Sequence, residues 1–180
     1  MRPFVCSIVV VLIFLVFTLQ AGDAPFLVGP ASGNSVDGDP PTLEYLQPAE
    51  DAAYDITVEA YVSSEQMRQQ QTEPLRVSRG SFRGMYWTIA QMLAHHTSTG
   101  CNLKPGDLMA SGTISGPDEE SRGCLLERTW RGQNPLELPD GTQRKFLADG
   151  DEVVIKAFCE KPGTPRIGFG ECRGVILPAN

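Results

Sequence analysis

The sequence is poor in positive charge and in histidine, and each shortage excludes a class of function. It has 15 Lys and Arg against 22 Asp and Glu, which gives a net charge of −7. A nucleic-acid surface needs clustered basic side chains, so this composition argues against nucleic acid as a partner. The only histidines are His95 and His96, and neighbours on a helix point about 100° apart, so they do not easily share one metal ion. A histidine that packs or hydrogen-bonds at a helix end is the preferred interpretation.

Metal-binding and redox motifs are also missing. The five cysteines have wide, irregular spacing without a C-x-x-C pair, which argues against a zinc ribbon or a redox motif. In a domain large enough to bury a core, such cysteines are expected to be free thiols. The Asp-Gly-Asp triplets at 37–39 and 149–151 lack the later Gly and Glu of a calcium-binding EF-hand loop, so they are predicted to be turns.

A long apolar run occurs only at the beginning of the sequence. Residues 1–22 contain Arg2 and then a charge-free apolar stretch, and Ala21 offers a small residue for cleavage. This arrangement is typical of a secretory signal peptide and is shorter than the ~20 apolar residues of a membrane-spanning helix. Taken alone, the leader predicts a secreted protein, and a membrane is a partner only if the leader is genuine. Residues 23–53 are rich in Gly, Pro, Asp and Ser and are predicted to be an extended loop.

The body that follows is predicted to be mainly β with one main helix, an α+β fold. Its alternating or β-branched stretches predict strands at 54–62, 107–115, 124–132, 152–159 and 166–177. The polar stretch 63–82 is predicted to carry a turn or hairpin. The helix is predicted within 82–107, because apolar residues recur there at three- and four-residue spacing and Gly100 can end it. Asp140-Gly141 predicts a hairpin turn.

Small residues and hydroxyls gather at the end of the short apolar strand 107–115. Gly112 and Gly116 allow close backbone approach, and Thr113 and Ser115 supply short hydroxyls. The loop suits a small carboxylate or carbonyl ligand, although a tight turn that caps its own backbone is favoured on spacing alone. Glu127 lies between apolar residues of a predicted strand, where it either faces solvent or is buried for a purpose, and composition does not decide between them.

Four segments of the body form a recognisable pattern. They read MYWTIAQMLAHHTSTGCNLKPGDLMASGTISGP, LLERTWRG, RKFLADGDEVVI and RIGFGECRGVILPA. Together they resemble the carboxy-terminal part of fumarylacetoacetase, over a stretch from about residue 54 to residue 179. The PGDLMASGTISGP segment is similar to the wider fumarylacetoacetate hydrolase superfamily, whereas the helix with two histidines and the RIGFGECRG ending resemble fumarylacetoacetase itself.

The resemblance implies a cytosolic, homodimeric hydrolase in tyrosine and phenylalanine breakdown. Such an enzyme cleaves a diketo acid, 4-fumarylacetoacetate, to fumarate and acetoacetate, and residues 54–180 would be part of its catalytic domain, a mixed β-roll. The resemblance assigns substrate contact to Thr113. It assigns to Glu127 the catalytic carboxylate that orients a histidine as the histidine activates water. A bound Mg²⁺ or Ca²⁺ would polarise the diketone oxygens.

The sequence departs from this family ahead of the matched part. There the family has its catalytic histidine and its acidic metal ligands, which include a Glu-x-Glu pair. This sequence has no such pair, because Glu119 and Glu120 are adjacent and Glu171 stands apart. The metal ligands are expected to be absent and the chain to be inactive by itself. Three interpretations stay open: an incomplete product with an unrelated leader, a secreted non-catalytic ligand-binding module, or a structural partner in a mixed dimer.

Overall fold

The computed structural model describes residues 11–15, 27–28, 43–46 and 53–179, with side chains described for 43–46 and 54–179. The Asp-Gly-Asp triplet at 37–39 and most of the predicted leader and loop lie outside these residues. The strands are β1 (Val11–Leu15), β2 (Leu27–Val28), β3 (Ala53–Tyr54), β4 (Thr57–Ser63), β5 (Leu75–Ser81), β6 (Leu108–Thr113), β7 (Leu136–Glu137), β8 (Gln143–Arg144), β9 (Glu152–Cys159) and β10 (Ile167–Val175). The helices are α1 (Glu65–Gln69), α2 (Ile89–Thr97) and α3 (Leu125–Arg128), with 3-10 turns η1 (Glu44–Leu46), η2 (Phe82–Gly84) and η3 (Glu119–Ser121).

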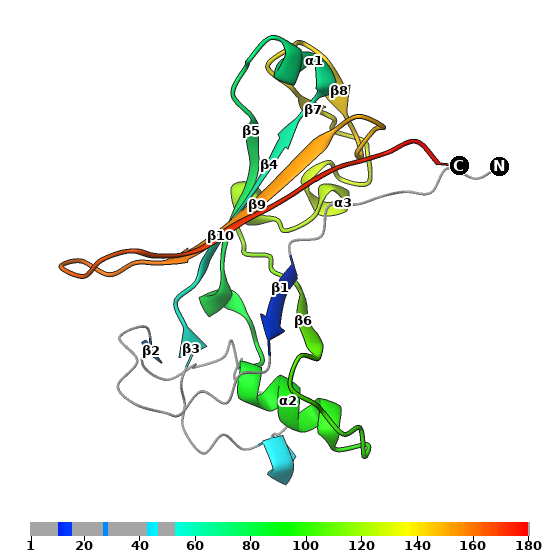
Figure 1. Ribbon diagram of the computed structural model, residues 1–180. Coiled ribbons are helices and arrows are strands. Elements are labelled where there is room, and N and C mark those ends of the chain that lie inside the picture. The colour runs from blue at the N-terminus through cyan, green and yellow to red at the C-terminus, as the bar shows by residue number, and fades with distance from the viewer. Residues whose placement is uncertain (1–10, 16–26, 29–42, 47–52, 180) are drawn as a thin grey trace.

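The main sheet has the strand order β10-β9-β4-β5, and its ladders are all antiparallel. Figure 1 shows β9 and β10 crossing the view diagonally beside β4, with the far end of the β9–β10 hairpin extending away from the other elements. Three two-stranded ladders join β1 to β6, β2 to β3 and β7 to β8. The prediction of a mainly β, α+β fold is therefore confirmed. Among the described residues, no helix is long and apolar enough to cross a membrane.

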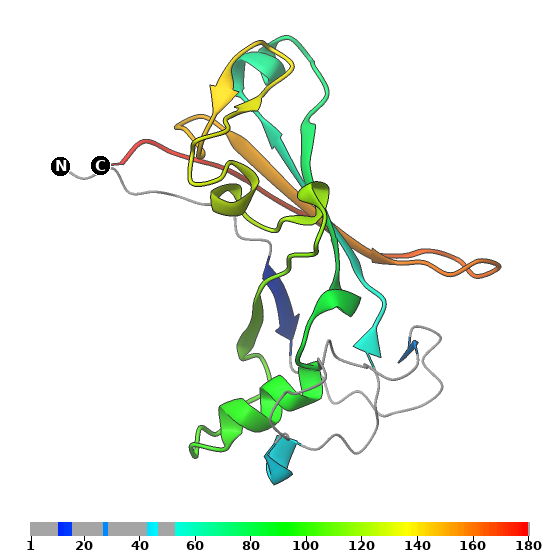
Figure 2. The same cartoon turned by 180° about the vertical axis from the view of Figure 1, so that it is seen from behind.

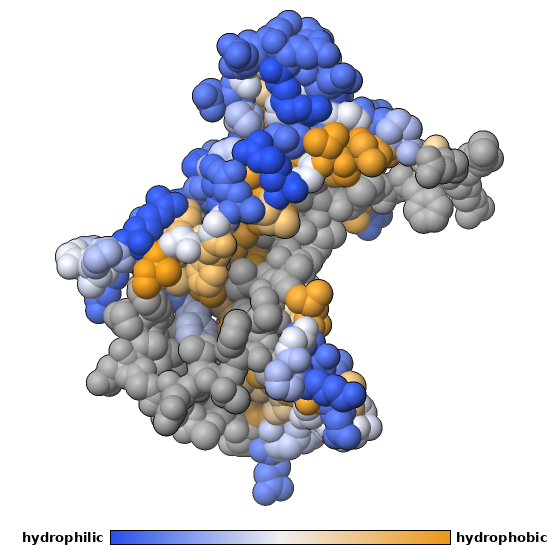
Figure 3. Space-filling model, in the orientation of Figure 1, coloured by the Kyte–Doolittle hydropathy of each residue, from blue (hydrophilic) through white to orange (hydrophobic). Residues whose placement is uncertain are grey.

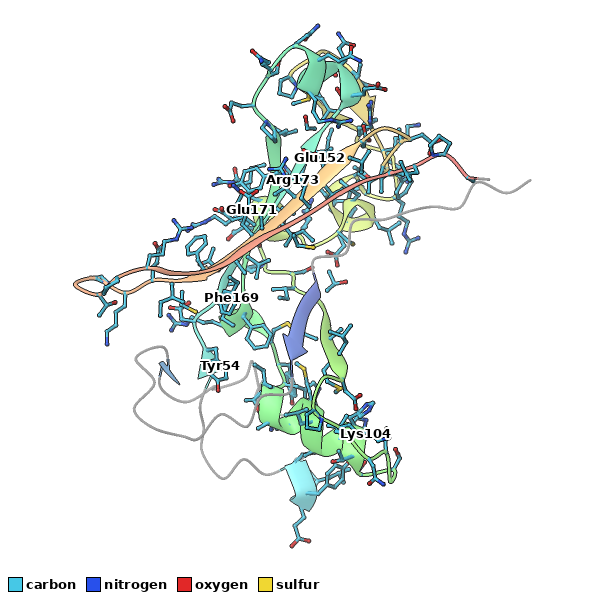
Figure 4. All side chains as sticks on the ribbon, viewed as in Figure 1. Tyr54, Lys104, Glu152, Phe169, Glu171 and Arg173 are labelled. Atoms are coloured by element: carbon cyan, nitrogen blue, oxygen red, sulfur yellow. The ribbon has the colours of Figure 1, made fainter. Side chains whose placement is uncertain are left out.

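The two faces of the main sheet differ in chemistry because cross-strand neighbours share a face. On one face, Lys156 lies opposite both Glu59 and Glu171, and its Nζ is 2.6 Å from a carboxylate oxygen of Glu171. Figure 4 shows Glu152, Arg173 and Glu171 along the β9–β10 pair, and Arg173 bonds both carboxylates. Figure 3 shows hydrophilic surface over much of this side.

The opposite face of the sheet builds the core. Its buried residues pack with side chains from η2, α3 and the segment after β6; the cluster comprises Ile56, Val58, Ala60, Val62, Val77, Phe82, Ile114, Leu125 and Cys159. Burial of such aliphatic side chains contributes roughly 1.5–3 kcal/mol each, so this cluster holds β6 and α3 against the sheet.

Helix α2 confirms the predicted helix, although it is shorter than the apolar spacing indicates. Thr88 and Gln91 form a capping box that fixes the start at Ile89, so Met85 lies before the helix. Gly100 follows the helix with a φ of +84°. The predicted turn or hairpin at 63–82 contains the short helix α1, for which Ser64 is the N-cap, and strand β5, which pairs antiparallel with β4.

The prediction of a strand at 124–132 is wrong. Leu125 and Thr129 are both almost fully buried, whereas Leu126 is 44% exposed. Burial at positions four apart is the period of a helix, and here it gives α3. The short strand at 107–115 forms as β6, but Leu108 at its start is 71% exposed, so β6 is not a buried strand.

Candidate functional site

The structure brings the loop after β6 and helix α3 into direct contact. Ser115 Oγ donates a hydrogen bond of 2.7 Å to Glu127 Oε2 and accepts one of 3.0 Å from the backbone N–H of Gly123. Thr113 is the last residue of β6, two positions before Ser115, and is half-buried. Thus Thr113 and Glu127, the two residues selected from the sequence, belong to one cluster joined through Ser115.

Close backbone approach makes this cluster possible. A Cβ on Gly123 would lie 2.1 Å from the carbonyl oxygen of Ile114 and 2.8 Å from Thr113 Cγ2. A Cβ on Gly116 would lie 2.6 Å from Ser121 Oγ, so the close approach predicted there is confirmed. Gly112 has open space around it and instead adopts a φ of +79°, a conformation that favours glycine. The sequence reasoning missed Gly123, whose signal is a lone glycine between Arg122 and Cys124.

A left-handed turn after α3 fixes the helix that carries Glu127. Trp130, Arg131 and Gly132 have φ values of 49°, 57° and 79° in succession. The left-handed region costs a non-glycine residue about 1–2 kcal/mol, so other contacts must hold this turn. Thr129 is fully buried, and its hydroxyl accepts the N–H of Gly132 at 3.0 Å and lies 2.7 Å from the carbonyl oxygen of Leu125. This network closes the end of α3.

Glu127 carries the carboxylate of the cluster. Its side chain is exposed to solvent and hydrogen-bonded through one oxygen. Cys124, three residues earlier, is no candidate nucleophile, because burial raises the pKa of its thiol and the Glu127 carboxylate raises it further. The cysteines at 101, 124, 159 and 172 are free thiols in the structure.

The histidines are not part of this cluster. They lie on α2, which Figures 1 and 2 both show at the end of β6 remote from α3. His95 Nδ1 is 3.1 Å from the hydroxyl of Tyr45, and the two rings stack, so the interpretation of a hydrogen-bonded histidine near a helix end is confirmed. Within residues 43–46 and 54–179, no three His, Cys, Asp or Glu side chains are grouped to hold a metal ion. The described residues therefore do not fit the Mg²⁺ or Ca²⁺ that the resemblance implies.

Comparison with known proteins identifies the family. A sequence model of the fumarylacetoacetate (FAA) hydrolase C-terminal family matches residues 16–177. Fumarylacetoacetase from Oryza sativa subsp. japonica is 48% identical over 141 residues, which cover 78% of this chain and 32% of the relative. Fumarylacetoacetase from Bos taurus is 47% identical over 150 residues, which cover 83% of this chain and 35% of the relative. Fumarylacetoacetase from Caenorhabditis elegans is 56% identical over 105 residues, which cover 58% of this chain and 24% of the relative. The matched part thus spans between about a quarter and a third of the length of these relatives. The chain belongs to the fumarylacetoacetate hydrolase C-terminal family.

Proposed function

We propose that this chain carries the substrate-side part of a fumarylacetoacetase-type active site and is inactive by itself. The observation that carries the proposal is the hydrogen bond between Ser115 and Glu127 beside the loop that begins at Thr113. Thr113 contacts the diketo acid substrate. Glu127 accepts a hydrogen bond from the imidazole of a histidine that this sequence does not contain, since His95 and His96 are its only histidines. This bond fixes the tautomer of that imidazole and stabilises its protonated form as water is activated.

Inactivity follows from what the described residues supply. They offer an orienting carboxylate and a substrate contact but neither a histidine beside Glu127 nor a group of metal ligands. A carbon–carbon bond hydrolysis that relies on a hard divalent ion needs several oxygen ligands, and these residues do not provide them. In the complete reaction the products are fumarate and acetoacetate, and the assembly is a cytosolic homodimer.

The test is complementation. The full chain is incubated with fumarylacetoacetate and magnesium, alone and with the remaining two-thirds of a fumarylacetoacetase polypeptide. We expect turnover only in the mixture, and Glu127→Gln should lower it by about 10²- to 10⁴-fold, the usual contribution of acid–base assistance. Glu137→Gln, a change at an exposed carboxylate on β7, is the control and should leave the rate unchanged. Turnover by the chain alone, or equal rates for the two variants, would contradict the proposal.

A second candidate role, a structural partner in a mixed dimer, is favoured by β10. Strand β10 is an edge of the main sheet in the described part of the chain, and all nine of its residues are exposed. Exposed edge strands readily pair with another chain. Co-purification of the chain with an intact fumarylacetoacetase subunit, lost when β10 is interrupted by Cys172→Pro, would support this role; retention of the complex by that variant would exclude β10 as the contact.

A further inference from the structure

The outer edge of β10 has the geometry to accept another strand. In the described part of the chain, β10 pairs only with β9, and this pairing is regular from Glu171 to Val175, beyond the bulge that begins at Gly168. The outer side of such an edge presents a row of backbone N–H and C=O groups. The sequence of β10, IGFGECRGV, contains neither proline nor lysine, two residues that often protect an edge from pairing.

Charges on the polar face alternate in sign across the sheet and stop at this edge. Glu59, Lys156 and Glu171 lie directly opposite one another on β4, β9 and β10. Opposite charges on neighbouring strands stabilise a sheet and like charges destabilise it, so a strand that continues this row should place a positive charge opposite Glu171. Arg173, two positions further along β10, carries such a charge and is 51% exposed (Figure 4).

A second copy of β10 supplies this charge in one register. When two identical strands pair antiparallel about a two-fold axis perpendicular to the sheet, opposite residues share a face only if the axis passes through a residue. An axis at Cys172 places Glu171 opposite Arg173 of the partner subunit, and the symmetry repeats this pair. An axis at Glu171 or at Arg173 instead places two identical charges opposite each other, which is unfavourable.

The apolar side of the strands agrees with the same register. Cys172 lies opposite Ile155 of β9, which in turn lies opposite Ala60 in the core, so Cys172 is on the core face of the sheet. With the axis at Cys172, this face continues into the core face of the second copy, and polar face continues into polar face. The exposed side chains of Phe169 and Val175, at the two ends of the contact, gain apolar neighbours.

From the edge geometry, the alternating charges and this symmetry, we propose that β10 pairs antiparallel with β10 of a second copy of this chain, with Cys172 on the two-fold axis. Exposed ion pairs contribute little affinity, so the charges select the register while the backbone ladder and apolar burial hold the copies together. The contact requires no catalysis, and none of its residues has a role in the proposed hydrolysis. It is therefore tested separately from the hydrolase proposal.

The test divides two charge reversals between two full-length chains, Glu171→Lys and Arg173→Glu. Either variant alone places like charges opposite each other across the contact, whereas a mixed pair has opposite charges at both positions. By sedimentation equilibrium, wild type should dimerise with increasing concentration, each variant should dimerise at least about fivefold more weakly, and an equimolar mixture should recover the dimer. Effects within one chain are the same in the mixture, so they do not mimic recovery. Glu137→Lys, an equal charge change on β7, is the control and should leave dimerisation unchanged.

Cys172 reports the register directly. Opposite residues of an antiparallel pair have Cα atoms roughly 4.5–5.5 Å apart, which a disulfide can span. Diamide takes up two electrons and two protons from two thiols and should link wild-type chains through Cys172. The link should be lost in Cys172→Ser and kept in Cys101→Ser, a change at another exposed free thiol. In the mixture of charge variants, links between unlike chains should outnumber links between like chains at least about fivefold, whereas random collision makes them about equal.

Several outcomes would overturn the contact: a wild-type chain that stays monomeric, a link that survives Cys172→Ser, undiminished dimers of either charge variant, or equal numbers of like and unlike links. Dimerisation only after an intact fumarylacetoacetase subunit is added would assign the edge to the mixed dimer and overturn self-association.

Discussion

Replacing Gly123 with alanine should destabilise the protein strongly, because this glycine lies against backbone. A Cβ there would be 2.1 Å from the Ile114 carbonyl oxygen and 2.8 Å from its carbonyl carbon. The atoms are not the flexible end of a side chain, so the segment from Thr113 to Ser115 has to move by roughly 1 Å to reach ordinary van der Waals separation. That movement would also weaken the hydrogen bond from the Gly123 N–H to Ser115 Oγ.

The expected cost has two parts. Overpacking of a tight site costs typically about 1–3 kcal/mol, and the upper end applies here because Ile114 is itself 1% exposed and held in the core. Loss of one backbone-to-hydroxyl hydrogen bond adds about 1 kcal/mol. The free energy of unfolding should therefore fall by about 3–4 kcal/mol. With a urea dependence of about 2 kcal/mol per M, the unfolding midpoint would drop by roughly 1.5–2 M.

Urea unfolding followed by circular dichroism measures this drop, and Gly80→Ala provides the control. A Cβ on Gly80 would lie 3.5 Å from the same Ile114 carbonyl oxygen, an ordinary contact. The free energy of unfolding of Gly80→Ala should change by less than about 1 kcal/mol, since alanine also restricts the unfolded chain. Equal midpoints for the two variants would refute the close approach of residue 123 to Ile114, and with it the geometry that joins α3 to the loop.

Three further changes test other parts of the structure. Thr129→Val keeps the shape but leaves the Gly132 N–H without its acceptor, so urea unfolding should show a loss of about 2 kcal/mol, whereas an unchanged midpoint would disprove the network after α3. Hydrogen bonds from the hydroxyls of Ser64 and Thr142 lower the pKa of Asp140 to about 2. The stability advantage of wild type over Asp140→Asn should therefore be complete above pH 4 and should vanish as the pH falls toward 2. A pH-independent difference between the thermal melts of the two proteins would contradict this. Phe169, 60% exposed on the edge strand β10, should promote aggregation, so Phe169→Lys should reduce light scattering at equal concentration, and no reduction would mean that this edge does not drive association.

Local sequence patterns predicted those elements whose side chains follow one period throughout. Strand β4 pairs with residues 152–158 of β9; the alternation of β4 and the β-branched run of β9 are both visible in the sequence. Helix α2 carries its own start signal at Thr88 and its stop at Gly100. These features depend on residues close in the chain, so no tertiary information was needed.

The strand prediction for residues 124–132 failed because this segment has no long period and depends on a contact distant in the chain. Its helix has only four residues, which is too short for a 3.6-residue period to be distinguished from alternation. The left-handed turn after it is held by the hydroxyl of Thr129 and by the carbonyl oxygen of Lys145, 3.1 Å away and 16 residues later in the chain. A pattern within the segment cannot contain that contact.

In the candidate site, the sequence indicated the residue types but not the contacts between them. Its hydroxyls and its glutamate could be selected from the sequence, because residue type limits what each can do. Their connection could not, since Ser115 and Glu127 are 12 positions apart and meet only because Gly123 lets the two backbones approach.

The hydrogen bond from Ser115 explains how an exposed carboxylate can keep one orientation. A glutamate on a four-residue helix would otherwise sample several rotamers, and each lost rotamer costs conformational entropy. Ser115 is held in turn by the Gly123 N–H, so its hydroxyl hydrogen points to Glu127 Oε2 and not to the backbone. With Oε2 fixed, the rotation of the carboxylate is restricted and Oε1 is left at a defined position from which it can accept an imidazole N–H. Under the proposed function, a histidine from outside this sequence would meet a carboxylate that is already oriented, and this is the condition under which such a pair contributes most to catalysis.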